Sequence, residues 1–346
     1  MRTSVHTLLF LITLTVALQG QSGRFVRAAK FPKPPLIDGR VDEEVWQLAE
    51  EIGGFIQYEP EHGQPSHLST VAHIGYGDEA LYVAFTCYDP EPEGIAAAVT
   101  KRDGSLDDDD AVVVMLDTFN DNTTCTYFTT NSLGTQSDGK VADNGRSRNE
   151  SWDATWLSAA VRTPEGWTAE FAIPFRILRF ESGEDQTWGV NLGRFYPRRQ
   201  EKSYWAGPLE DERRVSQFGD LTYLDLHGIV ERLELIPYAL SQAEEGQTPG
   251  GKAGFDLRYR ISSNLGGDLT VNPDFATIEA DVEEINLTRF ELEIPEKRPF
   301  FLEGGELFRQ RVQQFYSRRI GDIPWGQSSR ARWVPGIWPS WALSRN

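Results

Sequence analysis

Apolar and polar residues alternate with a period of two over much of the chain, which is the pattern of β-strands with one buried face. Residues 70–76 and 80–88 are two such runs, and Gly77-Asp78-Glu79 between them predicts a hairpin. Residues 111–116 are almost wholly apolar, as in a strand buried on both faces. Further strand-like runs cover residues 123–130, 155–161, 167–173, 188–195 and 218–223. These about seven or eight strands predict an all-β fold whose first domain is a two-sheet β-sandwich.

One segment ahead of these strands has the pattern of a helix. Asp42 is a suitable N-cap, and Val45, Trp46 and Ala49 form a short apolar stripe within residues 42–52. We therefore predict a helix at this place.

The pattern changes after Leu226. Residues 231–240 and 252–272 alternate over longer stretches, and in residues 255–261 the odd positions are apolar and the even positions charged. Alternation over about ten residues is typical of outer-membrane barrel strands, which place apolar side chains towards lipid. A soluble amphipathic hairpin explains the periodicity equally well.

The N-terminus has the pattern of an export signal. Arg2 precedes an apolar run at residues 8–18, and small and polar residues follow at 19–23. The run is shorter than the roughly 20 residues of a transmembrane helix. We predict a signal peptide over residues 1–22 and export to the periplasm or outer membrane.

Composition excludes one class of partner. Lys and Arg number 34 against 52 Asp and Glu, a net charge of −18. Such a field repels a phosphate backbone, so no nucleic acid is expected as a partner. Cys87 and Cys125 lack the spacing of a zinc or haem site; they either pair in an oxidising compartment or serve as small core residues.

Several short motifs occur in an order that resembles carbohydrate-binding module family 9-like domains. They are residues 37–46 (Ile-Asp-Gly-Arg-Val-Asp-Glu-Glu-Val-Trp), 80–85, 89–90, 110–117, 166–174, 188–191 and 218–221 (Phe-Gly-Asp-Leu). The resemblance covers about residues 29–226. It implies a β-sandwich and a carbohydrate ligand such as a glucan or xylan oligosaccharide.

The remainder resembles an uncharacterised outer-membrane β-barrel family, most distinctly at residues 295–304 (Pro-Glu-Lys-Arg-Pro-Phe-Phe-Leu-Glu-Gly). The resemblance implies that residues 230–321 are β-hairpins from the N-terminal part of a barrel, which is incomplete here because a closed barrel needs about eight strands. Residues 322–346, rich in Trp, Arg, Ser and Pro, lack the alternation. We interpret them as an irregular tail from a shifted reading frame, with a genuine loop as the alternative.

Sugar binding needs aromatic faces for stacking and polar groups for hydroxyls. Trp152 and Trp156 lie in a polar stretch and are the aromatics expected to be most accessible, with core packing as the alternative for each. Trp205 lies in a late loop and is a further candidate. Asn131 falls where the resembling family places a polar sugar contact.

The characterised sugar binders of that family clamp the ligand between two tryptophans. The matching positions here hold Ser-Leu-Asp at residues 105–107 and Asp-Glu-Arg at residues 211–213. The clamp is therefore missing. The resemblance supports the fold of the family more strongly than its affinity for sugars.

The acidic run at residues 107–110 suggests a hard cation. Asp108 and Asp110 are the candidate calcium ligands, because calcium takes several oxygen ligands. The run lacks EF-hand spacing, and a solvated loop is the commoner alternative.

Catalysis is not indicated, because no nucleophile or metalloprotease motif occurs. A hydrolase label travels with the resemblance, since family 9 modules accompany xylanases. Two functions remain. The first is a carbohydrate-binding module attached to an outer-membrane barrel in polysaccharide recognition or uptake; the second is an accessory domain of an outer-membrane transport or structural protein without sugar affinity. A haem-binding domain of similar shape is disfavoured, because it needs axial Met or His ligands at strand ends and Met115 lies inside an apolar strand.

Overall fold

The computed structural model of the chain describes residues 23–228, 233–242, 250–262, 265–272, 325–333 and 336–344. These residues form β-strands and short 3-10 turns, without an α-helix among them, as the alternating sequence predicts. In this described part of the chain, no helix is long and apolar enough to cross a membrane. The predicted signal peptide lies outside the described residues.

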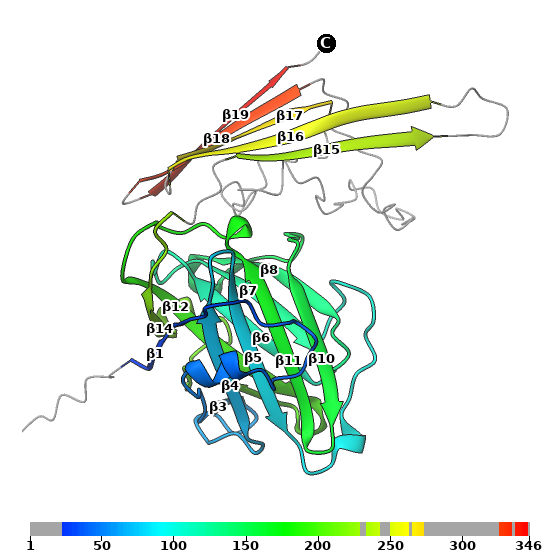
Figure 1. The fold of residues 1–346 in the computed structure, drawn as a ribbon, viewed down its shortest axis with the longest axis vertical. Helices are drawn as coiled ribbons and strands as arrows, with labels where there is room; N and C mark the ends of the chain where they lie inside the picture. Colours follow the sequence, from blue (N-terminus) through cyan, green and yellow to red (C-terminus); the bar gives the residue numbers. More distant parts are fainter. Residues whose placement is uncertain are drawn as a thin grey trace, which may run out of the picture.

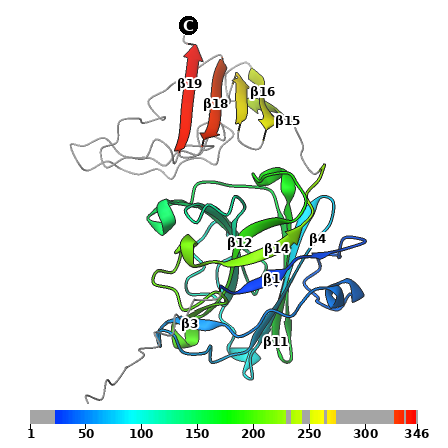
Figure 2. The ribbon, with the colours of Figure 1, turned by 90° about the vertical axis from the view of Figure 1, so that its left-hand side faces the viewer.

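Residues 25–224 form two sheets (Figure 1, Figure 2). The larger sheet runs in the order β1 (Phe25–Arg27), β14 (Gly219–Leu224), β12 (Gln186–Tyr196), β6 (Ala111–Asp117), β7 (Cys125–Asn131), β8 (Gln136–Ala142) and β9 (Ser147–Asn149), with β13 (Glu201–Tyr204) paired to β12 and β3 (Ile56–Glu59) paired to β13. The smaller sheet runs β10 (Leu157–Thr163), β11 (Gly166–Pro174), β5 (Ala80–Tyr88), β4 (Thr70–Tyr76) and β2 (Ala29–Lys30). Six 3-10 turns punctuate the chain: η1 (Glu44–Leu48), η2 (Pro92–Gly94), η3 (Asp143–Gly145), η4 (Phe175–Ile177), η5 (Pro197–Arg199) and η6 (Val215–Gln217).

The main hydrophobic core lies between these sheets and makes them a sandwich. Val83 and Phe85 face it from the smaller sheet, and Val112 and Val114 from the larger one. The predicted β4–β5 hairpin is confirmed, because the Gly77 amide donates to the Ala80 carbonyl at 3.0 Å.

The outer face of the larger sheet carries a second core. Ala111, Val113 and Met115 of β6 point to this side and pack with Leu106 and Leu209 from covering loops. The prediction that residues 111–116 are buried on both faces is therefore confirmed.

The outer face of the smaller sheet is covered by the N-terminal segment, which crosses it in blue in Figure 1. The predicted helix over residues 42–52 is wrong: the segment forms only the turn η1, and the side chain of its N-cap residue Glu43 accepts no capping hydrogen bond. The helix cannot extend because Ala49 is already in extended backbone and Ile52 bridges to Ala72. Trp46 packs edge-on against Phe31 instead of lying along a helical stripe.

A third sheet of five antiparallel strands follows. It consists of β15 (Leu233–Gln242), β16 (Gly250–Ser262), β17 (Leu265–Val271), β18 (Trp325–Trp333) and β19 (Gly336–Ser344) in that order. The prediction of an irregular tail over residues 322–346 is wrong for the last two strands, because β18 pairs with β17 along its length and β19 with β18. Small residues such as Gly326 and Ser328 interrupt the apolar alternation without interrupting the backbone hydrogen bonds between the strands.

Candidate functional site

The tryptophans singled out from the sequence are all buried. Trp152, Trp156 and Trp205 are 5%, 3% and 5% exposed and belong to the main core. Trp156 stacks on Phe171 with ring centroids 5.5 Å apart, and Trp152 packs edge-on against Phe128. The expectation that Trp152 and Trp156 are accessible is wrong, because the polar stretch around them folds over the core. Their role as sugar contacts stays a prediction.

Asn131 is also enclosed. Its amide nitrogen donates to the Val99 carbonyl at 2.9 Å and to Asp109 Oδ2 at 2.8 Å, and its oxygen accepts from the amides of Leu133 and Thr135. All of these partners fix the turn after β7 to a neighbouring loop. The side chain therefore has a structural task at this place.

A buried carboxylate ties the Trp156 region together. Asp138 accepts a hydrogen bond from Trp156 Nε1 at 2.7 Å and one from Arg102 at 2.6 Å. Burial raises the pKa of Asp138 to about 7, against the effect of its Trp156 hydrogen bond and of Arg102. Arg102 also contacts the exposed Asp153 at 2.7 Å. Trp156 is thus held by its ring faces and by its indole nitrogen.

The acidic run does not gather as a cation site. Asp110 is buried and accepts from the Ala96 amide at 2.8 Å, whereas Asp108 is exposed. Asp109 accepts from the amides of Ala98 and Val99. Within the described residues no group of three or more His, Cys, Asp or Glu side chains is placed to hold a metal ion. Calcium binding by Asp108 and Asp110 therefore rests on the sequence alone.

The two segments that replace the tryptophan clamp lie together on the outer side of the larger sheet. Lys202 of β13 links them, with its Nζ 3.4 Å from Asp107 Oδ1 and 3.4 Å from Glu212 Oε1. Glu59 of the paired strand β3 is 3.9 Å away. Burial lowers the pKa of Lys202, but these carboxylates outweigh it, and the pKa lies above its usual value. The four side chains form what we call the Lys202 patch.

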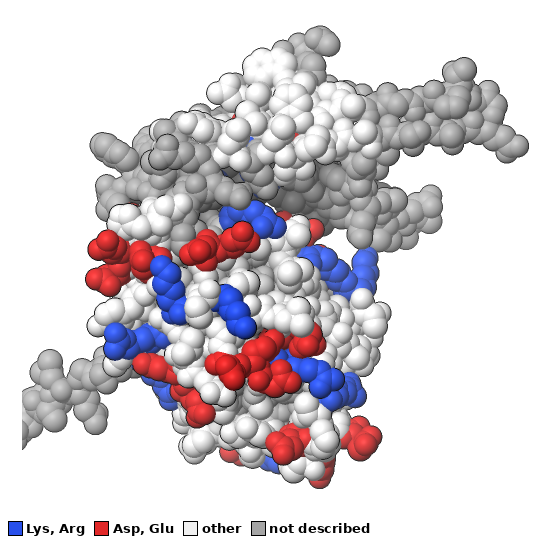
Figure 3. Space-filling model, in the orientation of Figure 1, with Lys and Arg blue, Asp and Glu red and all other residues white. Residues whose placement is uncertain are grey.

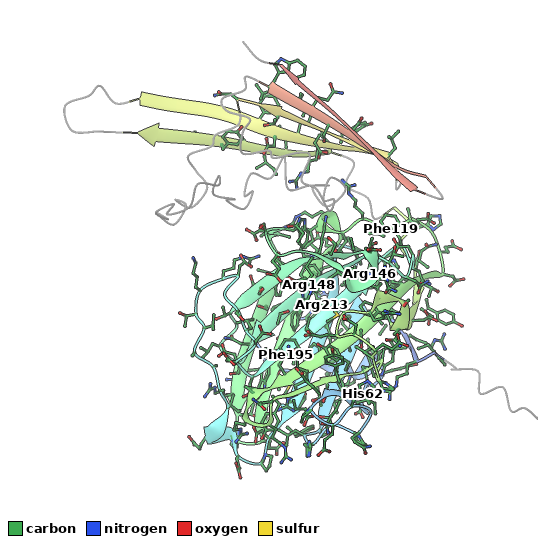
Figure 4. The ribbon with its side chains drawn as sticks, turned by 180° about the vertical axis from the view of Figure 1, so that it is seen from behind. His62, Phe119, Arg146, Arg148, Phe195 and Arg213 are labelled. Atoms are coloured by element: carbon green, nitrogen blue, oxygen red, sulfur yellow. The ribbon has the colours of Figure 1, made fainter. Side chains whose placement is uncertain are left out.

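Aromatic rings line the Lys202 patch from below. Lys202 Nζ lies 5.2 Å from the Phe195 ring centroid, and the Tyr204 hydroxyl donates to Glu212 at 2.9 Å. Tyr58, partly exposed, packs edge-on against Tyr204 and against the exposed ring of His62. Figure 4, seen from this side of the molecule, shows Phe195 and His62 on the same face. An apolar floor with carboxylate and ammonium groups above it is a surface that suits polyhydroxylated ligands.

Arg213 extends this face. Its guanidinium lies 4.8 Å above the ring of Tyr127 on β7, and its Nη1 is 4.0 Å from Glu150 Oε1. Burial raises the pKa of Tyr127 to about 12, although Arg213 acts against that rise. Sequence reasoning missed both Lys202 and Arg213. The only signal for them was the pair of positions where the resembling family has tryptophans.

A second buried carboxylate explains the first motif of the chain. Glu170 of β11 accepts hydrogen bonds from the amides of Asp38 (3.1 Å) and Gly39 (2.8 Å) and from Trp46 Nε1 (3.0 Å). Gly39 has φ +87°, and a Cβ there would lie 2.9 Å from the Ala160 backbone. The motif at residues 37–46 is thus the part of the N-terminal segment that docks on the smaller sheet.

This sandwich also corresponds to a family model. Residues 37–222, more than half of the 346 residues, match the model described as carbohydrate family 9 binding domain-like. The chain belongs to this family. The prediction of a family 9-like domain is confirmed, and Glu170, Trp46 and Gly39 lie within the match. Modules of this family are non-catalytic, in agreement with the prediction of a binding module and not an enzyme.

Residues 230–333 match a domain of unknown function (DUF5916), which extends past residue 321, where the second resemblance was expected to end. Two of the similar solved structures are a carbohydrate-binding module family 9 from Caldicellulosiruptor kristjanssonii in complex with cellotriose (16% identity, 57% of this chain and 93% of that chain, TM-score 0.43) and a putative carbohydrate-binding protein from Bacteroides uniformis ATCC 8492 (15%, 59% and 100%, TM-score 0.48). Because these identities and TM-scores are low, the family 9-like domain is identified by the family match alone. No curated protein matches the chain.

Proposed function

We propose that the family 9-like domain binds carbohydrate on the outer face of its larger sheet, at the Lys202 patch. The observation that carries this proposal is that residues 105–107 and 211–213 meet there, with Asp107 and Glu212 each 3.4 Å from one lysine nitrogen. Family membership supports a carbohydrate as the ligand class.

The chemistry of the patch sets the expected affinity. Carboxylates accept from sugar hydroxyls and the Lys202 ammonium donates to them, but the two large stacking rings of the clamp are replaced by Asp107 and Glu212. Aromatic stacking supplies much of the binding energy in such sites. We therefore expect weak binding of glucan or xylan oligosaccharides, as part of polysaccharide recognition or uptake.

The experiment is a glycan array and calorimetry with the intact chain, comparing wild type with Lys202→Ala. If Lys202 donates to the sugar, the variant binds more weakly by roughly tenfold to hundredfold, the value of one charge-assisted hydrogen bond. Lys30→Ala is the matched control, because Lys30 is an ion-paired lysine of the smaller sheet, 3.2 Å from Asp225. Binding that is unchanged in Lys202→Ala would place the sugar elsewhere.

The alternative is an accessory domain with no sugar affinity. The same ion pairs favour it, since Lys202 satisfies Asp107 and Glu212 without a ligand. In that case neither wild type nor variant binds any glycan on the array, and Lys202→Ala only lowers the stability of the loops that the lysine joins.

We further propose that the third sheet attaches the protein to the outer membrane, as the first part of a barrel. On one face, the register aligns Leu235, Leu257 and Leu269 on neighbouring strands. On the other face it aligns Arg258, Asp268 and Ser328, where Ser328 donates to the buried Asp268 at 3.0 Å. Leu235 is exposed and Leu257 and Leu269 are partly exposed, whereas Asp268 and Ser328 are buried. Apolar residues on the more exposed face and polar residues on the buried one are the arrangement of lipid-facing strands.

Fractionation of cells that express the intact chain tests this attachment. Leu235→Lys should release the protein from the outer-membrane fraction, because a lysine on a lipid-facing strand costs up to about 2–4 kcal/mol. Leu48→Lys is the control, since Leu48 is equally exposed, at 58%, but lies on the sandwich. Equal release by both variants, or wild type in the soluble fraction, would contradict the proposal. Sequencing of the mature N-terminus checks the predicted export signal.

A further inference from the structure

Arg213 is a largely buried cation with a hydrogen-bond donor that is unused. Its side chain is only 16% exposed, yet its Nη1 is buried without a hydrogen-bond partner among the described residues, and the carboxylate 4.0 Å from that nitrogen, Glu150, is 68% exposed. A guanidinium has five N–H donors in a planar fork. Burying such donors without partners is unfavourable unless something else accepts from them.

The surroundings of Arg213 are built rather than accidental. Its loop is fixed to the η3 hairpin by two hydrogen bonds of 3.0 Å between Asn144 and Ser216. A Cβ on Gly145 of that hairpin would lie 2.9 Å from the Arg213 carbonyl oxygen. The loop therefore presents the guanidinium over the Tyr127 ring in one position.

More positive charge lies beside Arg213. Arg148 of β9 acts electrostatically on the same Tyr127 hydroxyl as Arg213 does. Arg146, on the connection between η3 and β9, is exposed. Figure 4 shows the three arginines in the same part of the face seen from the larger sheet.

We propose that Arg213, with Arg148 beside it, binds the anionic group of an acidic glycan, either the carboxylate of a uronic acid or a sulfate ester. The inference rests on the proposed carbohydrate binding and names the ligand class of that face. A planar guanidinium matches two oxygens of either group with parallel hydrogen bonds, and the Tyr127 ring below it restricts the guanidinium to that plane. The Lys202 patch then contacts the hydroxyls of neighbouring sugar units.

The net charge of −18 does not oppose this ligand at close range. Charges more than about 8 Å apart are largely screened at physiological ionic strength. On the opposite side of the molecule, basic and acidic side chains are interspersed, and no acidic field dominates the view (Figure 3). Glu212, the acid next to Arg213 in sequence, is already engaged by Lys202 and by the Tyr204 hydroxyl.

Calorimetry with the intact chain tests the proposal with four probes: oligogalacturonate, its methyl ester, a sulfated galactan oligosaccharide and neutral xylo-oligosaccharides. The ester keeps the sugar and removes the charge. We expect an acidic probe to bind at least about tenfold more tightly than the ester or neutral probe, as for hydrogen bonds to a charged group. Whichever of the uronate and the sulfate binds identifies the source of the anion.

Arg213→Gln should abolish this preference, while Arg213→Lys should keep part of it. Arg214→Gln is the control, because Arg214 is ion-paired with Glu210 at 3.0 Å. Equal binding of acid and ester, or binding of neutral probes only, overturns the anion site and leaves the proposed function standing. No binding of any of these probes, nor of any glucan on the array, overturns both. The comparison of acid with ester uses the wild type alone, so it tests the anion site even if a variant does not fold.

Discussion

The Glu170 hydrogen bonds give a prediction whose sign depends on pH. Burial raises the pKa of Glu170 from 4.5 to about 7, with Glu43 acting in the same direction and the three donated hydrogen bonds against it. The folded chain thus holds this proton more tightly than the unfolded chain does. The stabilisation from the protonated Glu170 is full below pH 4.5 and is lost as the pH rises to 7. At about 1.4 kcal/mol per pKa unit, the free energy of unfolding falls by about 3 kcal/mol over this range.

Glu170→Gln removes the titration but keeps the shape. The amide oxygen can still accept from Asp38 and Gly39, whereas the amide nitrogen then faces the Trp46 N–H, a donor against a donor. One unsatisfied buried donor costs about 1–3 kcal/mol. We therefore expect the variant to be less stable than wild type by about 1–3 kcal/mol below pH 4.5 and, at pH 8, where wild type bears the ionised carboxylate, equal to it or more stable by up to about 2 kcal/mol.

Hydrogen exchange of the intact chain, measured by mass spectrometry in peptides that cover residues 37–46, reports the local stability of the segment that Glu170 holds. After correction for the intrinsic pH dependence of exchange, protection in wild type should fall from pH 5 to pH 8, and in Glu170→Gln it should fall much less. Glu165→Gln, at an exposed acid of the β10–β11 turn, should behave as wild type. An equal fall in wild type and Glu170→Gln would refute the reasoning.

Three further outcomes are expected. The piece comprising residues 24–226 should fold alone, because its core closes without the third sheet; circular dichroism dominated by helix, or by random coil, would contradict this. Cys87 and Cys125 are free and buried, and burial raises the pKa of Cys87 to about 12, so neither should react with iodoacetamide until the chain is unfolded; labelling of the native protein would refute it. Trp156→Ala should cost about 3–5 kcal/mol in urea unfolding, as for large buried aromatics, and leave sugar affinity at full folding unchanged; a selective loss of affinity would return Trp156 to the binding site.

The period-two pattern was sufficient to predict most strands of the sandwich. The runs at residues 70–76 and 80–88 coincide with β4 and β5, since both alternate and are bounded by turn residues. Strand β8 was missed because Gln136–Ala142 is mostly polar and small, and it is extended because it pairs with β7 and β9. The helix at residue 42 failed for a related reason: its apolar residues pack on the smaller sheet from a turn rather than along one stripe.

The site was harder to predict because accessibility is a property of the fold. The polar neighbours of Trp152 suggested an exposed ring. Instead, the Trp152 ring packs against Phe128 in the core, and Lys140 covers the Trp152 ring from outside. Lys202 and Arg213 are 11 residues apart in sequence on segments with no shared motif. Their meeting on one face depends on the pairing of β13 with β12 and on the loop that returns from it.

The sandwich closes with its two ends together. β1 runs parallel to β14, with Val26 opposite Leu221, almost 200 residues later in the chain. A chain that emerges N-terminus first must therefore keep its first strand unpaired until nearly the whole domain has been delivered. Contacts of such long sequence separation make folding slow and leave β1 without its partner strand until the end. During that interval β1 is a site for chaperone capture or for exchange between two copies. Deletion of residues 25–27, which leaves the edge of β14 open, should favour dimers built on β14.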